Sequence, residues 1–431
     1  MNSSSALYKV SDREFLRKAW KGISHRNMRS RGSDNVTIKA FKGSLEERLT
    51  EISAELRANK YIFTKLRAHA VSKAGSKKLR PLQIASVRDR VVMKALSLFV
   101  EPAFRRFNLE CSFAFIKERG VTPAIKRIQD LVAQGHKYYF EADIINFFGA
   151  VDRPTLWKMF SREVRQKSLL PLLQQCFNLE LEDLQNYKTE FQELFFHADS
   201  GIPQGGVLSP MLANFYLYQF DRRMLDRGFN LVRYADDFVV MCKTPEQARQ
   251  AHDLSKDTLR TLNLHIHALD EPNSKTRIGY FPKDGLLFLG IQFEGKETFP
   301  ASKVVDKFKS KIKEVLAPNT GDSLFKTLQK LTNLLNGWGK CYRSMKVVET
   351  YLRLDEFIKA SVENYLKEVG IQLVGKKRGR HMKLLGIPSL TSMVEYQKKS
   401  ASPPLADSSM QKVEELDGSQ TLLPVSTSIL N

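Results

Sequence analysis

The sequence has few cysteines and no pair of them at CxxC spacing, so a zinc finger or ribbon with the usual ligand pattern is excluded. The four cysteines stand far apart, as is typical of free thiols in a reducing compartment; they are Cys111, Cys176, Cys242 and Cys341. No apolar run reaches the roughly 18 residues that a membrane-spanning helix needs. Residues 1–20 contain no apolar segment of a secretory signal. We therefore expect a cytoplasmic protein with no membrane partner.

Acidic residues are scarce relative to basic ones. The 431 residues include 68 Lys and Arg against 47 Asp and Glu, a formal net charge of +21. Residues 301–400 hold 20 Lys and Arg against 9 Asp and Glu, so about half of the excess lies there. A clustered basic excess points to a polyanionic partner, most often nucleic acid, whereas an evenly spread one would indicate only a basic surface. The length predicts two or three domains.

Hydrophobic periodicity predicts a mixture of helices and strands without internal repeats. Residues 1–40 are polar and basic and predict one short helix followed by a loop. Ser44, with Glu47 three residues later, predicts a capping box at the start of the next helix. Trp338 and Tyr342, four residues apart, are expected in a helix core rather than on a base-stacking surface. Helices are predicted at 44–60, 87–104, 154–180, 211–226, 245–262, 302–316 and 323–368, and strands or extended segments at 76–84, 136–148, 231–241 and 285–295.

Two adjacent aspartates, Asp236 and Asp237, stand between apolar runs in LVRYADDFVVM at 231–241. Aspartate is a common turn residue, so a hairpin turn is one interpretation. A two-residue hairpin normally has glycine where φ is positive, however, and this stretch has none. Neighbouring carboxylates also repel each other unless a cation intervenes, and Mg²⁺ prefers carboxylate oxygens. On these residues alone, a turn and a metal site are equally supported.

A third aspartate, Asp143, ends an apolar stretch in YFEADIINFFGAVD, where it could simply cap a strand. Together with the pair at 236–237, it could complete a site for two divalent ions, the usual arrangement for nucleotidyl transfer. One ion lowers the pKa of the attacking hydroxyl, and the other stabilises the leaving pyrophosphate. Between the aspartates lies GIPQGGVLSPMLANFYL, in which Gly201, Gly205 and Gly206 allow close approach of the backbone to a ligand.

In this order, the motifs resemble those of reverse transcriptases of the group II intron type. ADIINFF resembles the family's block A, GIPQGGVLSPMLANFYL block B and YADD block C. KKLRPLQIASVRDRVVMKAL and SFAFIKERGVTPAI resemble the fingers, LNLHIHALDEPNSKTRI block D, LLFLGIQF block E, and LLNGWGKCYR the start of a maturase-type thumb. The family's usual Tyr-Gly-Phe-Arg reads Phe113-Ala114-Phe115-Ile116 here. The resemblance runs from about residue 40 to residue 370.

The resemblance implies a right-hand polymerase of the α+β class, with fingers, a palm built on an antiparallel sheet and a helical thumb. The tail is rich in Ser, Pro and Gln, which predicts disorder, with a segment that docks on binding as the alternative. The expected divisions are a basic N-terminal extension (1–40), fingers (41–135), palm (136–300) with a fingers insertion at about 155–195, basic helical thumb (301–390) and tail (391–431).

The resemblance also implies roles for single residues at the reaction centre. Asp143, Asp236 and Asp237 would be catalytic and would hold two Mg²⁺ or Mn²⁺ ions, assisted by the carbonyl of Ile144. Phe148 lies at the family's steric-gate position, where a ring would clash with a ribose 2′-hydroxyl and favour deoxynucleotides. A core phenylalanine is the structural alternative for Phe148.

Further roles concern the nucleotide and the nucleic acid. Deoxynucleotide binding would fall to Lys78 and Arg80 on the triphosphate, Gln204 beside the nascent base pair and Lys275 as a proton donor to pyrophosphate. Nucleic-acid binding would fall to Tyr234 below the primer end and to Lys303, Lys307, Lys311 and Lys313 along the backbone. A solvated basic strand, a surface lysine and a strand aromatic are the structural alternatives.

Among reverse transcriptases, the sequence resembles free-standing bacterial enzymes of the group II-like type, which include defence-associated ones. It lacks the Cys pairs of a zinc-containing endonuclease and the Val-Thr-Gly element of retron enzymes. Block B keeps Gln204-Gly205 and Ser209-Pro210, unlike the block of diversity-generating enzymes. We expect an RNA-directed DNA polymerase that copies a structured non-coding RNA into cDNA in anti-phage defence. The alternatives are a group II intron maturase without an endonuclease domain and a catalytically inert RNA-binding scaffold.

Overall fold

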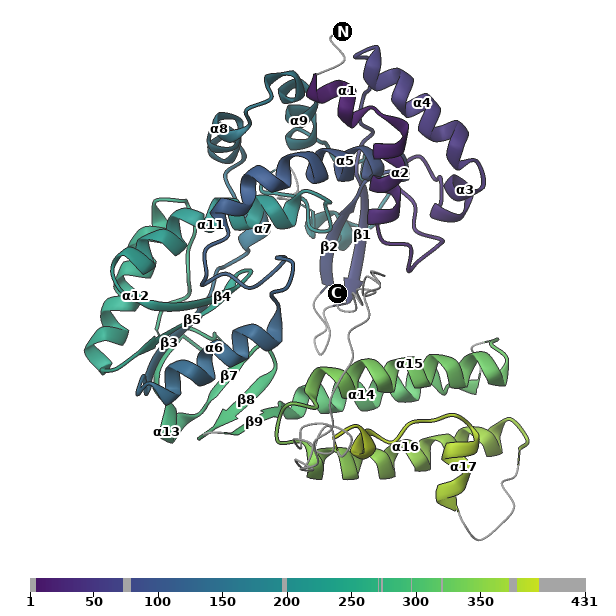
Figure 1. The fold of residues 1–431 in the computed structure, drawn as a ribbon, viewed down its shortest axis with the longest axis vertical. Coiled ribbons are helices and arrows are strands. Elements are labelled where there is room, and N and C mark those ends of the chain that lie inside the picture. Colours follow the sequence, from purple (N-terminus) through teal and green to yellow (C-terminus); the bar gives the residue numbers. More distant parts are fainter. Residues whose placement is uncertain are drawn as a thin grey trace, which may run out of the picture. The chain divides into compact units, whose positions relative to one another are not determined.

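The computed structural model describes residues 5–72, 79–195, 200–269, 271–272, 274–295, 297–318, 321–371 and 378–394. The chain forms two compact units that divide after Leu289 (Figure 1). Helices and antiparallel strands alternate in the first unit, so the predicted α+β class is confirmed. In the described ranges, no helix is both long and apolar enough to cross a bilayer. Lys78 and residues 395–431 of the predicted tail (391–431) lie outside the described residues.

A four-stranded antiparallel sheet in the order β4-β5-β3-β6 forms the centre of the predicted palm. Its strands are β3 (Tyr138–Asp143), β4 (Asn230–Tyr234), β5 (Asp237–Cys242) and β6 (Arg277–Tyr280). Helix α12 (Pro245–Arg260) packs on β3 and β5, and α6 (Val121–Ala133) packs on β4. The ring of Phe140 meets those of Phe238 and of His252 on α12, which fixes the buried face of the sheet. The predicted hairpin at 231–241 is confirmed as β4 and β5.

The N-terminal segment differs from the prediction of one short helix and a loop. It forms α1 (Ala6–Val10), α2 (Arg13–Gly22) and, after a loop, α3 (Ile38–Gly43). On α2, Leu16, Ala19 and Trp20 are buried, and the helix packs on α5 (Val87–Phe104). These three residues follow helical spacing, but the charges between them lower the average hydrophobicity. The segment is therefore part of the core of the first unit and not an appended basic arm.

The predicted capping box at Ser44 is wrong, although the helix itself is present as α4 (Leu45–Arg57). Because α3 ends immediately before it, Ser44 takes a backbone conformation (φ −123°, ψ 39°) in which its side chain does not cap the helix. Its hydroxyl instead accepts a hydrogen bond from Arg48 Nε at 2.8 Å. Leu49, Ile52 and Leu56 of α4 are buried, as the periodicity predicts.

A two-stranded hairpin, β1 (Arg67–Ser72) and β2 (Leu79–Ile84), precedes α5 and confirms the extended basic segment. The helix predicted at 154–180 is divided into α8 (Arg153–Glu163), a 3₁₀ turn η2 (Lys167–Leu169) and α9 (Leu170–Phe177). The segment after α9 returns to β1, where the Leu66 amide donates to the Glu180 carbonyl at 2.8 Å. The remaining elements of the first unit are η1 (Arg105–Phe107), α7 (Phe147–Ala150), α10 (Thr189–Glu193), α11 (Ser209–Asp226), α13 (Phe281–Asp284) and β7 (Leu286–Phe288).

The second unit begins with a hairpin, β8 (Ile291–Glu294) and β9 (Glu297–Pro300), and continues as helices. The strand predicted at 285–295 is therefore two strands, β7 and β8, separated by Leu289 and Gly290, both with positive φ. The helix predicted at 323–368 is interrupted at 343–347. Trp338 stacks on Phe308 with ring centroids 4.4 Å apart, so its predicted core position is confirmed. The helices are α14 (Ser302–Val315), α15 (Leu324–Tyr342), α16 (Val348–Glu368) and α17 (Arg378–Leu384).

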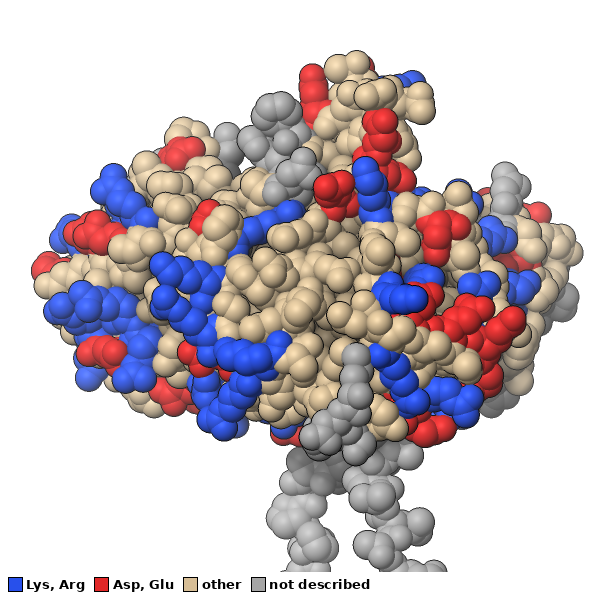
Figure 2. Space-filling view, turned by 90° about the horizontal axis from the view of Figure 1, so that it is seen from above, with Lys and Arg blue, Asp and Glu red and all other residues tan. Residues whose placement is uncertain are grey.

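The charge excess is not visible on every face of the molecule. Figure 2 shows one face on which Lys and Arg side chains are interspersed with Asp and Glu around a largely uncharged centre. A row of exposed lysines follows α14 instead. The exposed lysines of α14 belong to the basic excess found at residues 301–400.

Removal of the Trp20 side chain tests whether the N-terminal helices belong to the core. Trp20→Ala should lower the free energy of unfolding of the full chain by about 3 kcal/mol or more, because a buried ring that stacks on Phe41 is lost. Lys18→Ala, at an exposed position of the same helix, should change it by less than about 0.5 kcal/mol. Denaturant unfolding measures both, and equal effects would show that α2 lies outside the cooperative core.

Candidate active site

The end of β3 and the β4–β5 turn bring the three predicted aspartates together. In the antiparallel register, Asp143 lies opposite Asp237. Tyr234 also lies opposite Asp237, which leaves Ala235 and Asp236 as a two-residue turn. The amide of the residue after Asp143, Ile144, donates to the Asp236 carbonyl at 3.2 Å. The three carboxylates therefore occupy one end of the sheet although they come from two distant segments of the chain.

Ala235 occupies the turn position at which a two-residue hairpin usually has glycine. Ala235 has a φ of +58°, a left-handed conformation that a hairpin turn usually assigns to glycine or asparagine. A residue with a Cβ atom is strained there, and such strain is typical of functional sites. The carbonyl of Ala235 accepts a hydrogen bond from Arg233 Nη1 at 3.0 Å. A side chain from within the protein therefore holds the turn in a conformation that its own sequence does not favour.

Negative charge accumulates at this end of the sheet. Burial raises the pKa of Asp236, and the charges of Asp237 and Asp143 raise it further. Lys275 forms an ion pair with Asp237 and opposes this effect. Burial by itself would lower the pKa of Lys275, but the hydrogen bond to Asp237 and the charges of Asp237, Asp143 and Asp236 together raise it, and the net direction is upward. The site therefore favours cations, and its own lysine already provides one.

The donor atoms at this end of the sheet suit hard divalent cations. The candidate ligands are the carboxylates of Asp143, Asp236 and Asp237 together with the Ile144 carbonyl, all oxygen donors of the kind Mg²⁺ prefers. Among the residues that the structure describes, no group of three His, Cys, Asp or Glu side chains is already arranged as a metal cluster. Lys275 occupies an Asp237 oxygen in this conformation. Asp237 can bind a metal ion through its other carboxylate oxygen, or through this one once the Lys275 ammonium has moved away.

The glycine loop docks directly against Phe148. The Ile202 amide donates to the Phe148 carbonyl at 2.8 Å. Gly201 has a φ of +73°, and a Cβ atom there would lie 2.0 Å from the Phe148 carbonyl oxygen. The Phe148 ring is half-buried and its centroid lies 5.4 Å from that of Phe147, which is the fully buried member of the pair. The structure thus leaves part of the Phe148 ring accessible, unlike an ordinary core phenylalanine.

Gln204 belongs to the glycine loop, and Arg80 belongs to the β1–β2 hairpin that this loop contacts. The Gln204 carbonyl accepts from the Gln83 amide of β2 at 3.0 Å, which fastens the loop to the hairpin. Gln204 Oε1 is buried and has no hydrogen-bond partner within the described part of the chain. Gln204 and Asn146 both line a cavity of about 90 Å³. Arg80 is exposed on β2, where it is free of the core.

The predicted nucleic-acid contacts divide between the two units. Tyr234 is half-buried beside the turn, and burial raises the pKa of its phenol. Lys303, Lys307 and Lys311 recur at four-residue intervals along α14 and are exposed. Lys313 is exposed as well, but its ammonium lies 5.9 Å from the centre of the Phe357 ring on α16. The first three lysines therefore share one helix face, and Lys313 belongs to another.

Sequence motifs did not identify the groups that support the turn from behind. Arg233 and Asp221 form an ion pair with 1% and 0% of their side-chain surfaces exposed. Arg233 also donates to the side chains of Ser112 and Asn214. An arginine inside the apolar strand LVRY was the available signal, because a charge is rarely buried without a partner. Asp221 and Asn214 lie 12 and 19 residues away and Ser112 lies 121 residues away, and no spacing rule in the sequence links them to Arg233.

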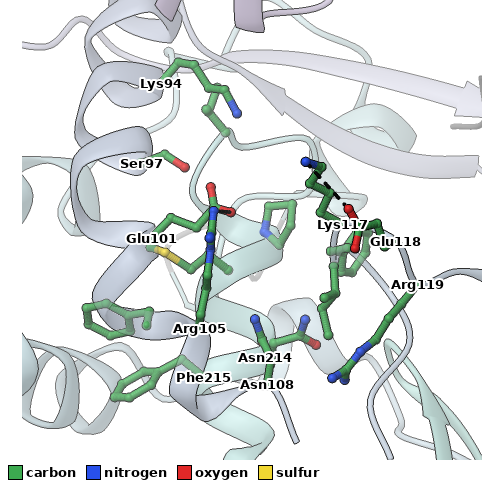
Figure 3. A pocket seen from close by; sticks show the side chains of 16 residues that line it. Lys94, Ser97, Glu101, Arg105, Asn108, Lys117, Glu118, Arg119, Asn214 and Phe215 are labelled. Carbon is green, nitrogen blue, oxygen red and sulfur yellow. Dashed lines mark ion pairs between the residues drawn. The ribbon is translucent and has the colours of Figure 1, made fainter. Parts of the chain in front are cut away.

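A cleft of about 680 Å³ lies between α5, the loop 108–119 and the start of α11 (Figure 3). Its lining includes the four cations Lys94, Arg105, Lys117 and Arg119 and the two carboxylates Glu101 and Glu118. Phe115 stands at the rim with 44% of its surface exposed and a φ of +61°, where a bulky residue is unusual. Asn214, which accepts a hydrogen bond from Arg233, also lines the cleft.

Comparisons with known proteins agree with this geometry. A family model described as "Reverse transcriptase (RNA-dependent DNA polymerase)" matches residues 71–293, just over half of the chain. Group II intron-encoded protein LtrA of Lactococcus lactis subsp. cremoris is 28% identical over 212 residues, which are 49% of this chain and 33% of LtrA. Protein YkfC of Escherichia coli (strain K12) is 26% identical over 307 residues, covering 62% of this chain and 77% of YkfC. The match thus spans about a third of the length of LtrA.

Two solved structures were also found as partial matches. A partial Cas6-RT-Cas1–Cas2 complex is similar with a TM-score of 0.36 and 23% identity, covering 60% of this chain and 42% of that chain. The telomerase of Candida albicans in complex with a TWJ fragment of telomeric RNA has a TM-score of 0.36 and 12% identity, covering 84% and 69%.

A methyl group at Gly201 tests the docking of the glycine loop on Phe148. Gly201→Ala should lower the melting temperature and accelerate hydrogen exchange at the Ile202 amide, because the added Cβ forces the loop away. Gly228→Ala is the matched control, since Gly228 has a similar φ of +76° but open space around its Cα. Both variants carry the backbone strain of roughly 1 kcal/mol. Equal destabilisation by the two would contradict the close approach at Gly201.

Proposed function

The chain belongs to the reverse transcriptase (RNA-dependent DNA polymerase) family, and we propose that it synthesises DNA on an RNA template from deoxynucleoside triphosphates. The observation that carries this proposal is the convergence of Asp143, Asp236 and Asp237 at one end of the palm sheet. The glycine loop docked on Phe148 supplies a nucleotide site beside them. This arrangement favours a catalytic protein over a catalytically inert RNA-binding scaffold, because a scaffold would not need three adjacent carboxylates.

Asp143, Asp236 and Asp237, assisted by the Ile144 carbonyl, would hold two Mg²⁺ or Mn²⁺ ions. When bound, such ions neutralise charge on the attacking 3′-hydroxyl oxygen and on the leaving pyrophosphate. Lys275 stays protonated because its pKa is raised by Asp237, although burial opposes this. After release from Asp237, its ammonium can donate a proton to the pyrophosphate oxygen. The same side chain thus balances charge in the free enzyme and acts as a general acid during turnover.

Nucleotide selection would depend on groups around the glycine loop. The accessible part of the Phe148 ring would exclude a ribose 2′-hydroxyl and admit deoxyribose. The unpartnered Oε1 of Gln204 would accept a hydrogen bond near the nascent base pair. The exposed guanidinium of Arg80 would contact the triphosphate, together with Lys78.

The template and primer would contact both units. In the first unit, the cleft of Figure 3 offers cations for phosphates and the exposed ring of Phe115 for stacking on a base. Tyr234 would lie below the primer end. In the second unit, Lys303, Lys307 and Lys311 would follow the nucleic-acid backbone, and Lys313 would add charge beside them.

We propose further that the template is a structured non-coding RNA and that its cDNA serves anti-phage defence in the bacterial cytoplasm. A second candidate is an intron maturase, which the similarity to group II intron-encoded protein LtrA favours. Both functions require RNA binding, but they differ in the RNA that is bound. The identity of the bound RNA therefore distinguishes them.

Sequencing the RNA and DNA that co-purify with the full chain from host cells, with and without phage, tests these functions. One dominant RNA with complementary DNA is expected from the wild-type protein. Asp236→Ala/Asp237→Ala should retain the RNA and lose the DNA, because the nucleic-acid contacts lie elsewhere. Flanking intron sequence in the RNA would indicate a maturase. RNA without any complementary DNA would contradict polymerase activity, and unchanged phage sensitivity after gene deletion would exclude the defence role.

Truncation of the Phe148 ring tests sugar selection. Phe148→Val should raise the ratio of ribonucleotide to deoxynucleotide incorporation about 10–100-fold, because removal of one steric clash changes discrimination by roughly 1–3 kcal/mol. Single-nucleotide primer extension with each substrate measures this ratio. The rate with the deoxynucleotide is the internal control and should change much less. An unaltered ratio would assign Phe148 to the core.

A further inference from the structure

We propose that Arg233 is a positioning residue that fixes the catalytic turn and connects it to α11 and to the loop at 111–114. The inference rests on the proposed function, because the positioned groups are the aspartates of DNA synthesis. It concerns a residue behind the reaction centre that would touch neither substrate nor metal. Its effect would pass through the turn that carries Asp236 and Asp237.

All the hydrogen-bond donors of the Arg233 side chain are in use. A guanidinium has five N–H donors in a rigid planar fork. Nε and Nη2 donate to the two carboxylate oxygens of Asp221 at 2.6 and 2.5 Å. The other donors reach Ser112 Oγ at 3.0 Å, Asn214 Oδ1 at 3.2 Å and the Ala235 carbonyl at 3.0 Å. Every donor has one acceptor, so the orientation of the guanidinium is fixed.

The acceptors of these hydrogen bonds belong to different parts of the first unit. Asn214 and Asp221 are buried on α11, and Ser112 is buried in the loop before α6. The backbone of Arg233 is held by the same loop: its amide donates to the Cys111 carbonyl at 2.8 Å, and its carbonyl accepts from the Phe113 amide at 2.9 Å. One side chain therefore joins the helix, the loop and the catalytic turn.

The turn at Ala235 and Asp236 needs to be stabilised by a group from outside the turn. Ala235 is held at a φ of +58° without the freedom of glycine, and its carbonyl is an acceptor for Arg233. An ion pair between Arg233 and Asp221 alone would stabilise the core equally well, so core stability does not require the hydrogen bond to the Ala235 carbonyl. The contact with Ala235 acts on the residue immediately before Asp236. Loss of Arg233 should therefore let the turn relax and displace the carboxylates.

The connection also extends toward the substrates. Helix α11 starts directly after the glycine loop, whose Ile202 amide binds the Phe148 carbonyl. Asn214 lies on the same helix, lines the cleft of Figure 3 and donates to the Ala114 carbonyl at 2.9 Å. The Asn214 amide group thus lies between the cleft and Arg233. Through it, the position of the cleft wall is tied to the position of the turn.

The test compares the full-length wild-type chain with Arg233→Met/Asp221→Leu on a defined RNA template and DNA primer. This double substitution removes the ion pair without leaving a buried unpaired charge, so the fold should persist. We expect kcat to fall about 10²-fold, as a displacement of about 1 Å at the reacting groups would cause. KM for the deoxynucleotide and Kd for the template–primer should stay within about threefold.

Two matched variants separate positioning from stability. Tyr61→Phe removes a buried hydrogen bond, at 2.7 Å, to Asp89 far along the chain from the turn, and should lower the melting temperature while leaving kcat unchanged. Ala235→Gly, added to the double variant, should restore part of kcat because glycine adopts a positive φ without strain. Such non-additivity is expected only if Arg233 acts through the turn.

Each result decides between a positioning role and a merely structural role for Arg233. A fall in kcat with rescue by Ala235→Gly supports positioning, whereas an unchanged kcat, or a loss without rescue, overturns it. If circular dichroism shows that the double variant is unfolded, Arg233→Lys replaces it, because one ammonium can neutralise Asp221 but cannot also span to Ala235. The same loss of kcat is then expected, and wild-type kcat would overturn the proposal. Absence of DNA synthesis by the wild-type chain would instead contradict the proposed function.

Discussion

The antiparallel pairing of β3 with β5 is the constraint on which the candidate site depends. Its register sets Asp143 opposite Asp237 and leaves Asp236 at the tip of the adjoining turn. Because side chains alternate between the faces of a sheet, a slip of one residue would send a carboxylate to the opposite face. Phe140 and Phe238 meet edge to face in the buried layer, with centroids 5.8 Å apart, and oppose such a slip. The packing of the core therefore specifies where the charges gather.

The protein compensates its charges near the turn in two physically different ways. Lys275 and Asp237 are partly exposed, with 59% and 29% of their side-chain surfaces accessible, so this pair can exchange with ions or phosphates. Arg233 and Asp221 are almost completely buried, and removing one partner would leave an uncompensated charge in the core. The exposed pair can therefore separate and rearrange during a reaction cycle. The buried pair serves as a fixed support for the turn.

The meeting of Asp143, Asp236 and Asp237 could be predicted from the sequence because each lies in a short contiguous motif, and the missing glycine beside Asp236 correctly indicated an unusual turn. Most helices followed from hydrophobic periodicity, whereas the α+β fold followed from the resemblance to reverse transcriptases. The support of the turn could not be predicted, because Arg233 and its partner Ser112 are 121 residues apart and the two motifs that contain them do not indicate that they meet. The buried N-terminal helices were also missed, since Leu16 and Trp20 are surrounded by charges that obscure a narrow apolar face. Tertiary contacts, which no local pattern encodes, decided both cases.

The central claim is that Asp143 acts with the turn aspartates in one site that makes DNA on RNA. Primer extension on a defined RNA template, with deoxynucleotides and Mg²⁺, tests it most directly when wild type is compared with Asp143→Asn. Asp257→Asn, at an exposed position on α12, is the matched control. The account predicts DNA synthesis by the wild type and the control and a loss of about 10²-fold or more in Asp143→Asn, with RNA binding retained. Wild-type synthesis by Asp143→Asn, or none by the wild type itself, would contradict it.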